Sequence, residues 1–390
     1  MSLNNTPSAN RVHIGFFGCR NAGKSSLVNA VTGQDLSVVS SVAGTTTDPV
    51  SKAMELLPLG PVLIIDTPGF DDEGDLGEKR IEKTRKTLDK TDIAVMVIDA
   101  EKGLQDADRT LISIIKEKEI PYITVFNKCD GEDVKTDGAI CVSAKTGKNI
   151  DKLKAAIGDL ADKDAPPRLI GDKVSTGDIV LLVTPIDEVA PKGRIILPQQ
   201  QVIRDLLDSG AIPVLTRDIE LKAATESLGD KIKMVICDSQ VFKGTNEIVK
   251  KSIPLTSFSI LMARQKGFLA TAVEGIKAIE NLKDGDRLLI SEGCTHHRQC
   301  NDIGTVKIPR WLRTFTGRDI IIETSSGADF PDDLTPFRAV IHCGGCMLTE
   351  RQIKERMKKA KMQNVPFINY GTLIAHINGI LERSIDLFKS

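Results

Sequence analysis

The stretch that most constrains the fold is a glycine loop near the N-terminus, GCRNAGKS at residues 18–25. An apolar run precedes it and a helical pattern follows it, so the sequence predicts a strand, a loop and a helix in that order. Glycines at these positions let backbone N–H groups turn inward around phosphate oxygens, and the helix adds its positive end. The lysine can reach the β and γ phosphates, and the serine hydroxyl can hold Mg²⁺. This spacing predicts a nucleotide-binding domain. The loop residues that we assign to nucleotide binding are Gly18, Asn21, Gly23, Lys24, Ser25 and Ser26.

Two further motifs predict that the nucleotide carries guanine. VLIIDTPGF is a buried strand ending at Asp66, which can hold the Mg²⁺ shell, and the N–H of Gly69 can sense the γ-phosphate. YITVFNKCD is another strand, and its last residue, Asp130, can accept hydrogen bonds from the N1–H and the amine of guanine. Adenine would leave that carboxylate unpaired, which can cost roughly 10⁴ in selectivity at the high end. The residues assigned to the base are Asn127, Lys128, Asp130, Ser143, Ala144 and Lys145.

The segment AGTTTDP, residues 43–49, lies where a mobile switch belongs. We choose Thr46 as the Mg²⁺-binding threonine, with Thr45 and Thr47 as its rivals. The catalytic set is then Lys24, Thr46, Asp66 and Gly69.

Together these signatures resemble a small Ras-like GTPase domain, and GTTTD and DTPGF resemble its Era and MnmE branch. The resemblance implies slow GTP hydrolysis, because a hydrophobic residue, here Phe70, replaces the glutamine that elsewhere orients the attacking water. It also implies a potassium site, because Asn21 matches the asparagine that helps to bind K⁺ in some members.

Composition excludes several classes of partner. Lys plus Arg is 52 and Asp plus Glu is 53, so no global field attracts nucleic acid or an anionic membrane. No apolar run approaches the roughly 18 residues of a membrane span, and the N-terminus lacks a signal-peptide pattern. We therefore expect a cytoplasmic protein, in which the eight cysteines are metal ligands or buried residues rather than disulfides.

The chain is long enough for two or three domains, and βα alternation continues to its end. We expect an α/β protein of three domains, with the GTPase domain at 1–165 followed by domains at 166–270 and 271–390. The last two are expected to be smaller parallel-sheet units. Self-association of the middle domain is inferred because it lacks a phosphate loop or catalytic constellation.

Cysteines and histidines gather in the last hundred residues, as GCTHHRQC at 293–300 and IHCGGCM at 341–347. Both follow predicted strands, and ligands bind at that edge of an open α/β sheet. Cys294, Cys343 and Cys346 would supply three sulfurs if the two strands are neighbours, and a helix starting near Cys346 would lower the thiol pKa values. An iron–sulfur cluster, a four-ligand zinc site that includes His296, and buried cysteines with no metal all remain open.

The combination of a GTPase domain with Cys294-Thr295-His296, 45 further residues and His342-Cys343-Gly344-Gly345-Cys346 resembles the [FeFe]-hydrogenase maturation GTPases, the HydF family. The resemblance implies a homodimeric scaffold with a dimerisation domain at 166–270 and a cluster-binding domain at 271–390, which holds a [4Fe-4S] cluster on the three cysteines. Such a scaffold receives a diiron precursor from two radical-SAM maturases and delivers it to apo-[FeFe]-hydrogenase. The fourth ligand stays open among His296, His297, His342, Cys300 and an exchangeable group.

Two other functions compete. One is an Era- or MnmE-type GTPase in RNA modification or ribosome assembly, which the basic helix ERQIKERMKKAKM favours but the absence of a GXXG clamp in KH context disfavours. The other is a regulatory GTPase with structural zinc.

Overall fold

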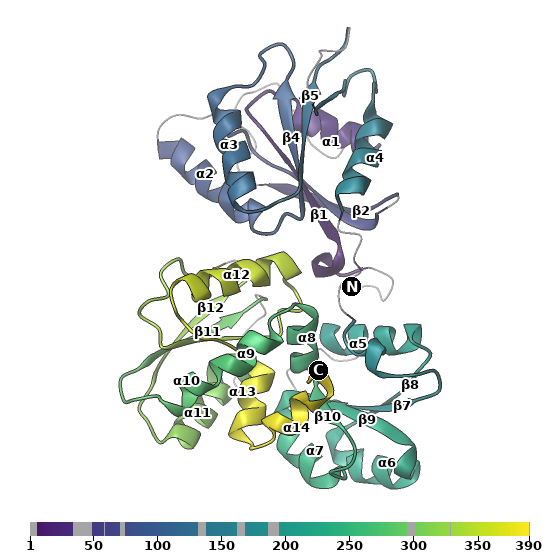
Figure 1. Ribbon diagram of the computed structural model, residues 1–390, viewed down its shortest axis with the longest axis vertical. Coiled ribbons are helices and arrows are strands. Elements are labelled where there is room, and N and C mark those ends of the chain that lie inside the picture. The colour runs from purple at the N-terminus through teal and green to yellow at the C-terminus, as the bar shows by residue number, and fades with distance from the viewer. Residues whose placement is uncertain are drawn as a thin grey trace. The chain divides into compact units, whose positions relative to one another are not determined.

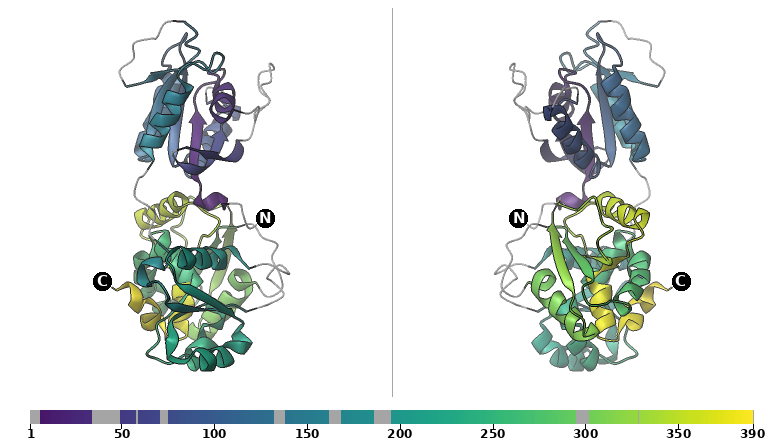
Figure 2. Two further views of the ribbon diagram at one scale, coloured as in Figure 1. Left: turned by 90° about the vertical axis from the view of Figure 1, so that its right-hand side faces the viewer. Right: turned by 90° about the vertical axis from the view of Figure 1, so that its left-hand side faces the viewer.

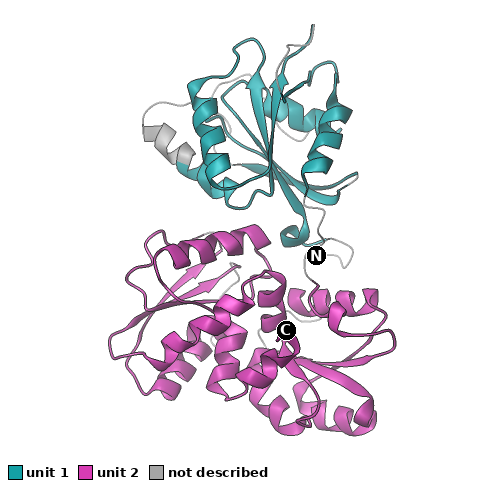
Figure 3. Ribbon diagram, in the orientation of Figure 1, with its two compact units in different colours: residues 1–165 teal, residues 166–390 magenta. Residues whose placement is uncertain are grey.

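The computed structural model describes the chain as two compact units, residues 1–165 and 166–390 (Figure 3). The described residues are 6–33, 49–57, 59–70, 75–131, 138–161, 168–185, 195–294, 302–327 and 329–389. None of the helices in these ranges combines the length and the apolar character needed to cross a bilayer.

The first unit contains a six-stranded sheet in the order β2-β3-β1-β4-β5-β6, parallel except for β2. Its strands are β1 (Val12–Phe17), β2 (Val50–Leu56), β3 (Gly60–Asp66), β4 (Ile93–Asp99), β5 (Tyr122–Asn127) and β6 (Ile140–Cys141). Its helices are α1 (Lys24–Thr32), α2 (Asp75–Leu88), α3 (Asp106–Glu117) and α4 (Ile150–Leu160). β4 is buried along its whole length, as expected for a central strand covered on both faces. The predicted strand, loop and helix around the glycine loop are confirmed as β1 and α1.

The second unit contains two four-stranded parallel sheets (Figure 1). The sheet nearer in sequence has the order β10-β9-β7-β8, with β7 (Ile179–Val183), β8 (Ile212–Thr216), β9 (Ile232–Cys237) and β10 (Leu255–Ser257). Its helices are α5 (Leu197–Asp208), α6 (Leu221–Leu228), α7 (Phe242–Ile248) and α8 (Phe258–Gln265). The other has the order β12-β11-β13-β14, with β11 (Arg287–Glu292), β12 (Ile321–Ser326), β13 (Ala339–His342) and β14 (Phe367–Asn369). The remaining helices are α9 (Leu269–Gly275), α10 (Lys277–Glu280), α11 (Ile308–Thr316), α12 (Glu350–Met362), α13 (Tyr370–Ile377) and α14 (Leu381–Ile385). The predicted α/β class with three parallel-sheet parts is confirmed.

The β11–β14 sheet is covered on both faces, because alternate strand residues contact different helices. Ile290 and Ile341 lie in one core cluster with residues of α11, and Leu289 and Val340 lie in another with residues of α12. The views in Figures 1 and 2 agree with this sandwich of helix, sheet and helix.

The two sheets of the second unit repeat one design, which the sequence analysis did not recognise. In both, the first strand lies between the second and the third, and the fourth lies outside the third. Equivalent hydrogen bonds recur: Val235 N donates to Pro254 O at 2.9 Å, and Val340 N donates to Pro366 O at 2.8 Å. Strand pairing places Cys237 in β9 where His342 stands in β13. We call residues 177–267 the first repeat and residues 285–379 the second repeat.

The two repeats share one core. A single hydrophobic cluster contains Leu181 and Val235 from the first repeat and Ile290 and Ile341 from the second. The expected domain boundary at residue 270 falls between the repeats and stays a prediction.

Candidate functional site

The phosphate loop connects β1 to α1 and is folded around the ammonium of Lys24. Lys24 is buried, and its Nζ donates to the carbonyl oxygens of Gly18 at 3.0 Å and Cys19 at 2.8 Å. Asn21 adopts a left-handed conformation with φ 62°. Gly23 is left-handed too, and a Cβ there would lie 2.3 Å from Asn127 Nδ2, so only glycine fits. These contacts within the loop fix its conformation at the start of α1.

The predicted Mg²⁺ residues lie next to one another. Ser25 Oγ donates to Asp66 Oδ2 at 2.6 Å, joining the start of α1 to the end of β3. A Cβ on Gly69 would meet Arg20 Cα at 2.8 Å, so the DTPG turn approaches the phosphate loop closely. Phe70 is buried in a cluster with Phe17 and Leu88, and its phenyl ring has no polar group with which to orient a water. Thr46 and its rivals lie outside the described residues.

The guanine motifs are joined by side-chain hydrogen bonds. Asn127 Nδ2 donates to Ala22 O at 3.0 Å, and Asn127 Oδ1 accepts from Ala144 N at 3.1 Å. Ser143 Oγ donates to Asp130 Oδ1 at 2.6 Å, which holds the carboxylate that would read the base. One amide thus ties the phosphate loop to the base-binding loops.

Lys128 and Lys145 lie at the outer side of these motifs, and both side chains are exposed. Lys128 Nζ donates to Asp99 Oδ2 at 2.6 Å, and this contact helps to keep the pKa of Asp99 below its usual value although burial opposes it. For Ser26 the structure shows only a half-buried side chain in the first turn of α1.

The thiol site lies where the second repeat changes direction. From β11 the chain moves to β12 on one side, and from β13 it moves to β14 on the other. The carboxyl ends of β11 and β13 therefore form a topological switch point, where open α/β sheets bind ligands. Cys294 follows β11 and Cys343 follows β13. The two strands pair in parallel, which is the condition under which Cys294 can supply a third sulfur.

Backbone contacts bring the two cysteine loops together. Cys343 N donates to Ser291 O at 3.0 Å. Cys343 Sγ accepts from the backbone N–H of Gly293 at 3.1 Å and of Gly345 at 3.3 Å. Each loop therefore contributes an amide to the same sulfur, which is a contact that iron–sulfur proteins use to tune their clusters.

The thiol pKa values are raised, so the prediction that a helix end would lower them was wrong. Burial, with a smaller contribution from Cys343, raises the pKa of the Cys346 thiol to about 12. Burial, Cys343 and Cys346 raise the pKa of the Cys294 thiol to about 12 as well. The helix begins only at Glu350, with Thr349 as its cap, and loss of water outweighs its dipole.

His342 is fully occupied by protein contacts. Its Nδ1 lies 2.7 Å from Cys343 O, and its Nε2 lies 2.9 Å from Arg356 Nη1. Burial lowers the pKa of His342 to about 3, and Arg356 contributes to the shift. With both ring nitrogens engaged, this imidazole has no lone pair directed at the thiols. His296, His297 and Cys300 lie outside the described residues.

The structure adds charged residues that the sequence motifs did not reveal. Glu292 and Asp302 are buried and add to the rise in the pKa of Cys294, whereas the buried cations Lys266 and Arg356 partly oppose the rise at Cys346 and Cys343 respectively. Glu292 and Asp302 flank the GCTHHRQC segment, Arg356 lies in the basic helix after Cys346, and Lys266 lies in the first repeat. No metal-ligand spacing assigns a role to any of these four charges.

The three thiols fit a thiolate-bound metal group. They come from loops that follow two paired strands. The raised pKa values keep the Cys294 and Cys346 thiols protonated, and binding of a soft metal cation displaces such protons. Within the described ranges no three His, Cys, Asp or Glu side chains stand in an arrangement that would already hold a metal ion. The fit therefore rests on the donor set and not on a finished coordination shell.

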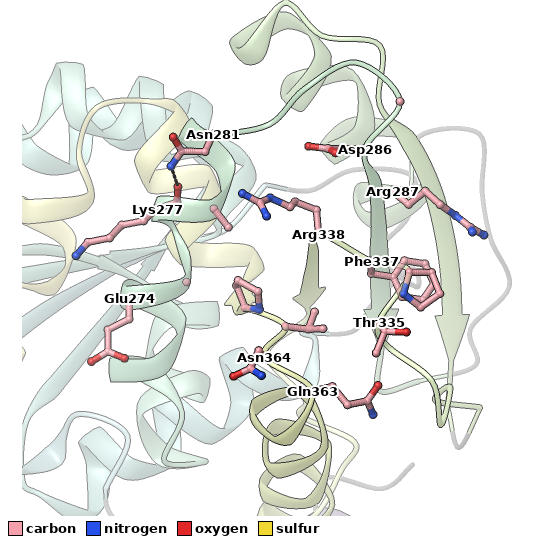
Figure 4. Close-up of a pocket in the computed structure, with 16 residues that line it drawn as sticks. Glu274, Lys277, Asn281, Asp286, Arg287, Thr335, Phe337, Arg338, Gln363 and Asn364 are labelled. Atoms are coloured by element: carbon pink, nitrogen blue, oxygen red, sulfur yellow. Dashed lines mark hydrogen bonds between the residues drawn. The ribbon is translucent and has the colours of Figure 1, made fainter.

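A separate recess of about 620 Å³ lies at the opposite edge of the same sheet (Figure 4). Arg287 and Arg338 line it at the starting ends of β11 and β13, with Asn281 and Asn364 across from them. The thiol loops are at the finishing ends of those strands, so this recess is no part of the thiol site.

Comparison with protein families assigns all three parts of the chain. The model described as the 50S ribosome-binding GTPase matches residues 13–128. The model of the hydrogen maturase F dimerization domain matches residues 169–267, and that of the hydrogen maturase F tetramerization domain matches residues 270–387. The last two together span more than half of the chain.

Two curated relatives are GTPases, and each match covers 37% of this chain. GTPase Der of Wolinella succinogenes is 36% identical over 37% of this chain and 35% of its own length. The tRNA modification GTPase MnmE of Dechloromonas aromatica is 33% identical over 37% of this chain and 33% of its own length. The chain thus spans about a third of the length of these relatives. A crystal structure of Aquifex aeolicus Era bound to GDP and AlF4⁻ is 21% identical, covering 53% of this chain and 92% of that one, with a TM-score of 0.35, too low to support an argument.

Proposed function

The chain belongs to the hydrogen maturase F family and is a GTPase, and from this premise we propose that it carries metal for the [FeFe]-hydrogenase active site. In this proposal Cys294, Cys343 and Cys346 hold a [4Fe-4S] cluster. The protein receives a diiron precursor from two radical-SAM maturases and delivers it to the apo-hydrogenase. The family membership favours this function over the Era or MnmE alternative, because hydrogen maturase F models match residues 169–267 and 270–387, whereas the match to MnmE covers 37% of the chain.

The observation that carries the proposal is the pairing of β11 with β13. It brings Cys294 beside the Cys343–Cys346 loop across about fifty residues of chain, at the edge where such sheets bind ligands. Three thiolates would bind three of the four irons and leave the fourth iron open to an exchangeable ligand. An open iron suits a carrier that must release its cargo.

The role of GTP follows from the nucleotide site. Lys24 would neutralise the phosphates, Ser25 and Asp66 would hold Mg²⁺, and Asp130 would select guanine. Thr46 and Asn21 complete the set as proposed Mg²⁺ and K⁺ ligands. Because Phe70 is buried and cannot orient water, we expect slow hydrolysis in which GTP acts as a switch. A cluster-transfer rate that is the same with GTP, GDP and no nucleotide would refute the coupling.

Self-association belongs to the same proposal. The two matched models are named for dimerization and tetramerization, so the family forms oligomers through these regions. We propose a homodimer formed through residues 166–270.

The test is the metal content after anaerobic reconstitution. Iron, sulfide and zinc are measured for the wild type, for Cys343→Ala and for Cys237→Ala, which removes a buried thiol of the first repeat as a matched control. We expect about four irons and four sulfides per chain in the wild type and the control, and a loss of most of both in Cys343→Ala.

Two outcomes would redirect the proposal. One tightly held zinc without stable iron would establish the GTPase with structural zinc instead. Iron content that is unchanged in Cys343→Ala would show that the cluster, if bound, is held elsewhere.

A further inference from the structure

Arg356 differs from the other cations of α12 because it is buried. The helix sequence ERQIKERMKKAKM is strongly basic, and Lys358 and Lys361 are exposed to water. Arg356 is only 7% exposed, although a guanidinium is costly to bury without partners. Its contacts must therefore offset that cost.

Those contacts reach three strand ends around the thiol site. Arg356 Nη1 donates to His342 Nε2 at 2.9 Å and to Ser291 Oγ at 3.3 Å. Nη2 donates to the carbonyl oxygen of Gly327, which follows β12. The guanidinium also lies 4.9 Å from the centre of the Phe330 ring. One side chain thus joins the ends of β11, β12 and β13.

Two of these contacts lead directly to the cysteine loops. An arginine does not give up its proton in proteins, so His342 Nε2 must accept and Nδ1 must carry the hydrogen. That hydrogen is donated to the carbonyl of Cys343, 2.7 Å away. Ser291, the second partner, accepts the backbone N–H of Cys343 on its own carbonyl, three residues before Cys294.

The described residues of the first repeat, 177–185 and 195–267, do not show this arrangement. Cys237 occupies the position of His342, and the helix between the third and fourth strands, α7, is only seven residues long. Within the described ranges, the buried pair of His342 and Arg356 is therefore specific to the thiol-bearing copy.

We propose that Arg356 is a positioning residue that aligns the two cysteine loops for the cluster and places a permanent positive charge beside it. The inference rests on the proposed function. The guanidinium fixes the His342 tautomer and the ends of β11 and β13, so the thiols are arranged before metal arrives. Its charge stabilises the more negative, reduced state of the cluster, and so raises the reduction potential.

The test compares Arg356→Met, Arg356→Lys and, as the matched control on the same helix, Lys358→Met. All are full-length chains reconstituted anaerobically with iron and sulfide. Three quantities are measured: the midpoint potential of the cluster, the rate at which a chelator removes iron, and the fluorescence of Trp311. Trp311 packs against the shared core of the second unit, so its fluorescence reports that this unit has folded.

We expect Arg356→Met to lose iron to the chelator several-fold faster than the wild type and to have a more negative potential. Arg356→Lys keeps the charge but not the planar fork, so its potential should stay near that of the wild type while its iron loss is faster. Lys358→Met should match the wild type in all three. If Arg356→Met does not fold, the Arg356→Lys chelation rate decides alone.

Wild-type potential and chelation rate in both Arg356 variants would overturn the inference while the proposed function stood. A wild type that binds no iron–sulfur cluster would refute the proposed function itself, and the positioning role with it.

Discussion

The first and second repeats of the larger unit have the same topology but different contents at the switch point. In the second repeat, Cys294 and Cys343 follow the two central strands, and His342 and Arg356 support them. In the first, the residue after β9 is Asp238, whose N–H donates to Val183 O at 3.0 Å just as Cys343 N donates to Ser291 O. The backbone scaffold is therefore separable from the chemistry it presents.

This comparison teaches which contacts belong to the scaffold. Features present in both copies, such as the buried third strand and the glycine after the last helix, should contribute equally to stability. Features present in only one copy should affect metal binding and leave the scaffold largely intact. Matched substitutions in the two repeats test whether the contacts divide between scaffold and metal binding in this way.

The largest expected effect comes from the third strands. Ile236 and Ile341 occupy the same register position, and both are fully buried. Ile236→Ala and Ile341→Ala should each destabilise the metal-free unit by about 2–5 kcal/mol, because each leaves a cavity. Urea unfolding followed by Trp311 fluorescence measures this, since the only tryptophan packs against the shared core. A cost in one repeat alone would break the equivalence.

A smaller effect is expected at the glycines that follow the last helices. Gly267 has φ 76° and Gly379 has φ 67°, and a Cβ would clash at neither position. Gly267→Ala and Gly379→Ala should therefore cost only the backbone strain of a left-handed alanine, roughly 1–2 kcal/mol each. The same fluorescence titration checks it. If the two costs differ widely, one of these helix ends is held by contacts that the other lacks.

The smallest expected effect is a pH dependence of stability that arises from Cys237, which occupies in the first repeat the register position of His342. Burial raises the pKa of the Cys237 thiol well above its ordinary value of 9.0. The folded state thus holds this proton more tightly than the unfolded chain does. The contribution to stability is complete below about pH 9 and is lost as the pH rises further. Cys237→Ala should lose less stability than the wild type between about pH 8 and pH 10.5, and equal losses in urea titrations would contradict the assignment.

The nucleotide site could be predicted from sequence because its chemistry is local. Lys24, Asp66 and Asn127 each sit at a strand end or loop in a short motif, and the sheet brings those ends together. The pairing of β11 with β13 was only a condition for the predicted thiol site, and the structure meets that condition. Thr46 and the histidines of GCTHHRQC stay predictions, because they lie outside the described residues.

Long-range features escaped the sequence analysis. The direction of the thiol pKa shift depends on burial, which no motif reports, and the sequence of the basic helix does not show that Arg356 alone among its cations is buried. The repeat itself left a trace, since IPLTSFSILMARQKG at 253–267 resembles VPFINYGTLIAHING at 365–379. A search for internal similarity would have found it.

The repeat also bears on how this unit folds. Strands β7–β10 pair only with one another within residues 179–257, and β11–β14 do so within residues 287–369. Neither sheet needs a strand from the other copy, so each can nucleate from a contiguous length of chain. The step that requires both copies is the docking of α8 on α13, where Ser259 Oγ donates to Asn369 Oδ1 at 3.2 Å and accepts from Gly371 N at the same distance. During synthesis, the strands of the first repeat can therefore pair before the thiol-bearing strands leave the ribosome, and the shared core closes when the second repeat docks.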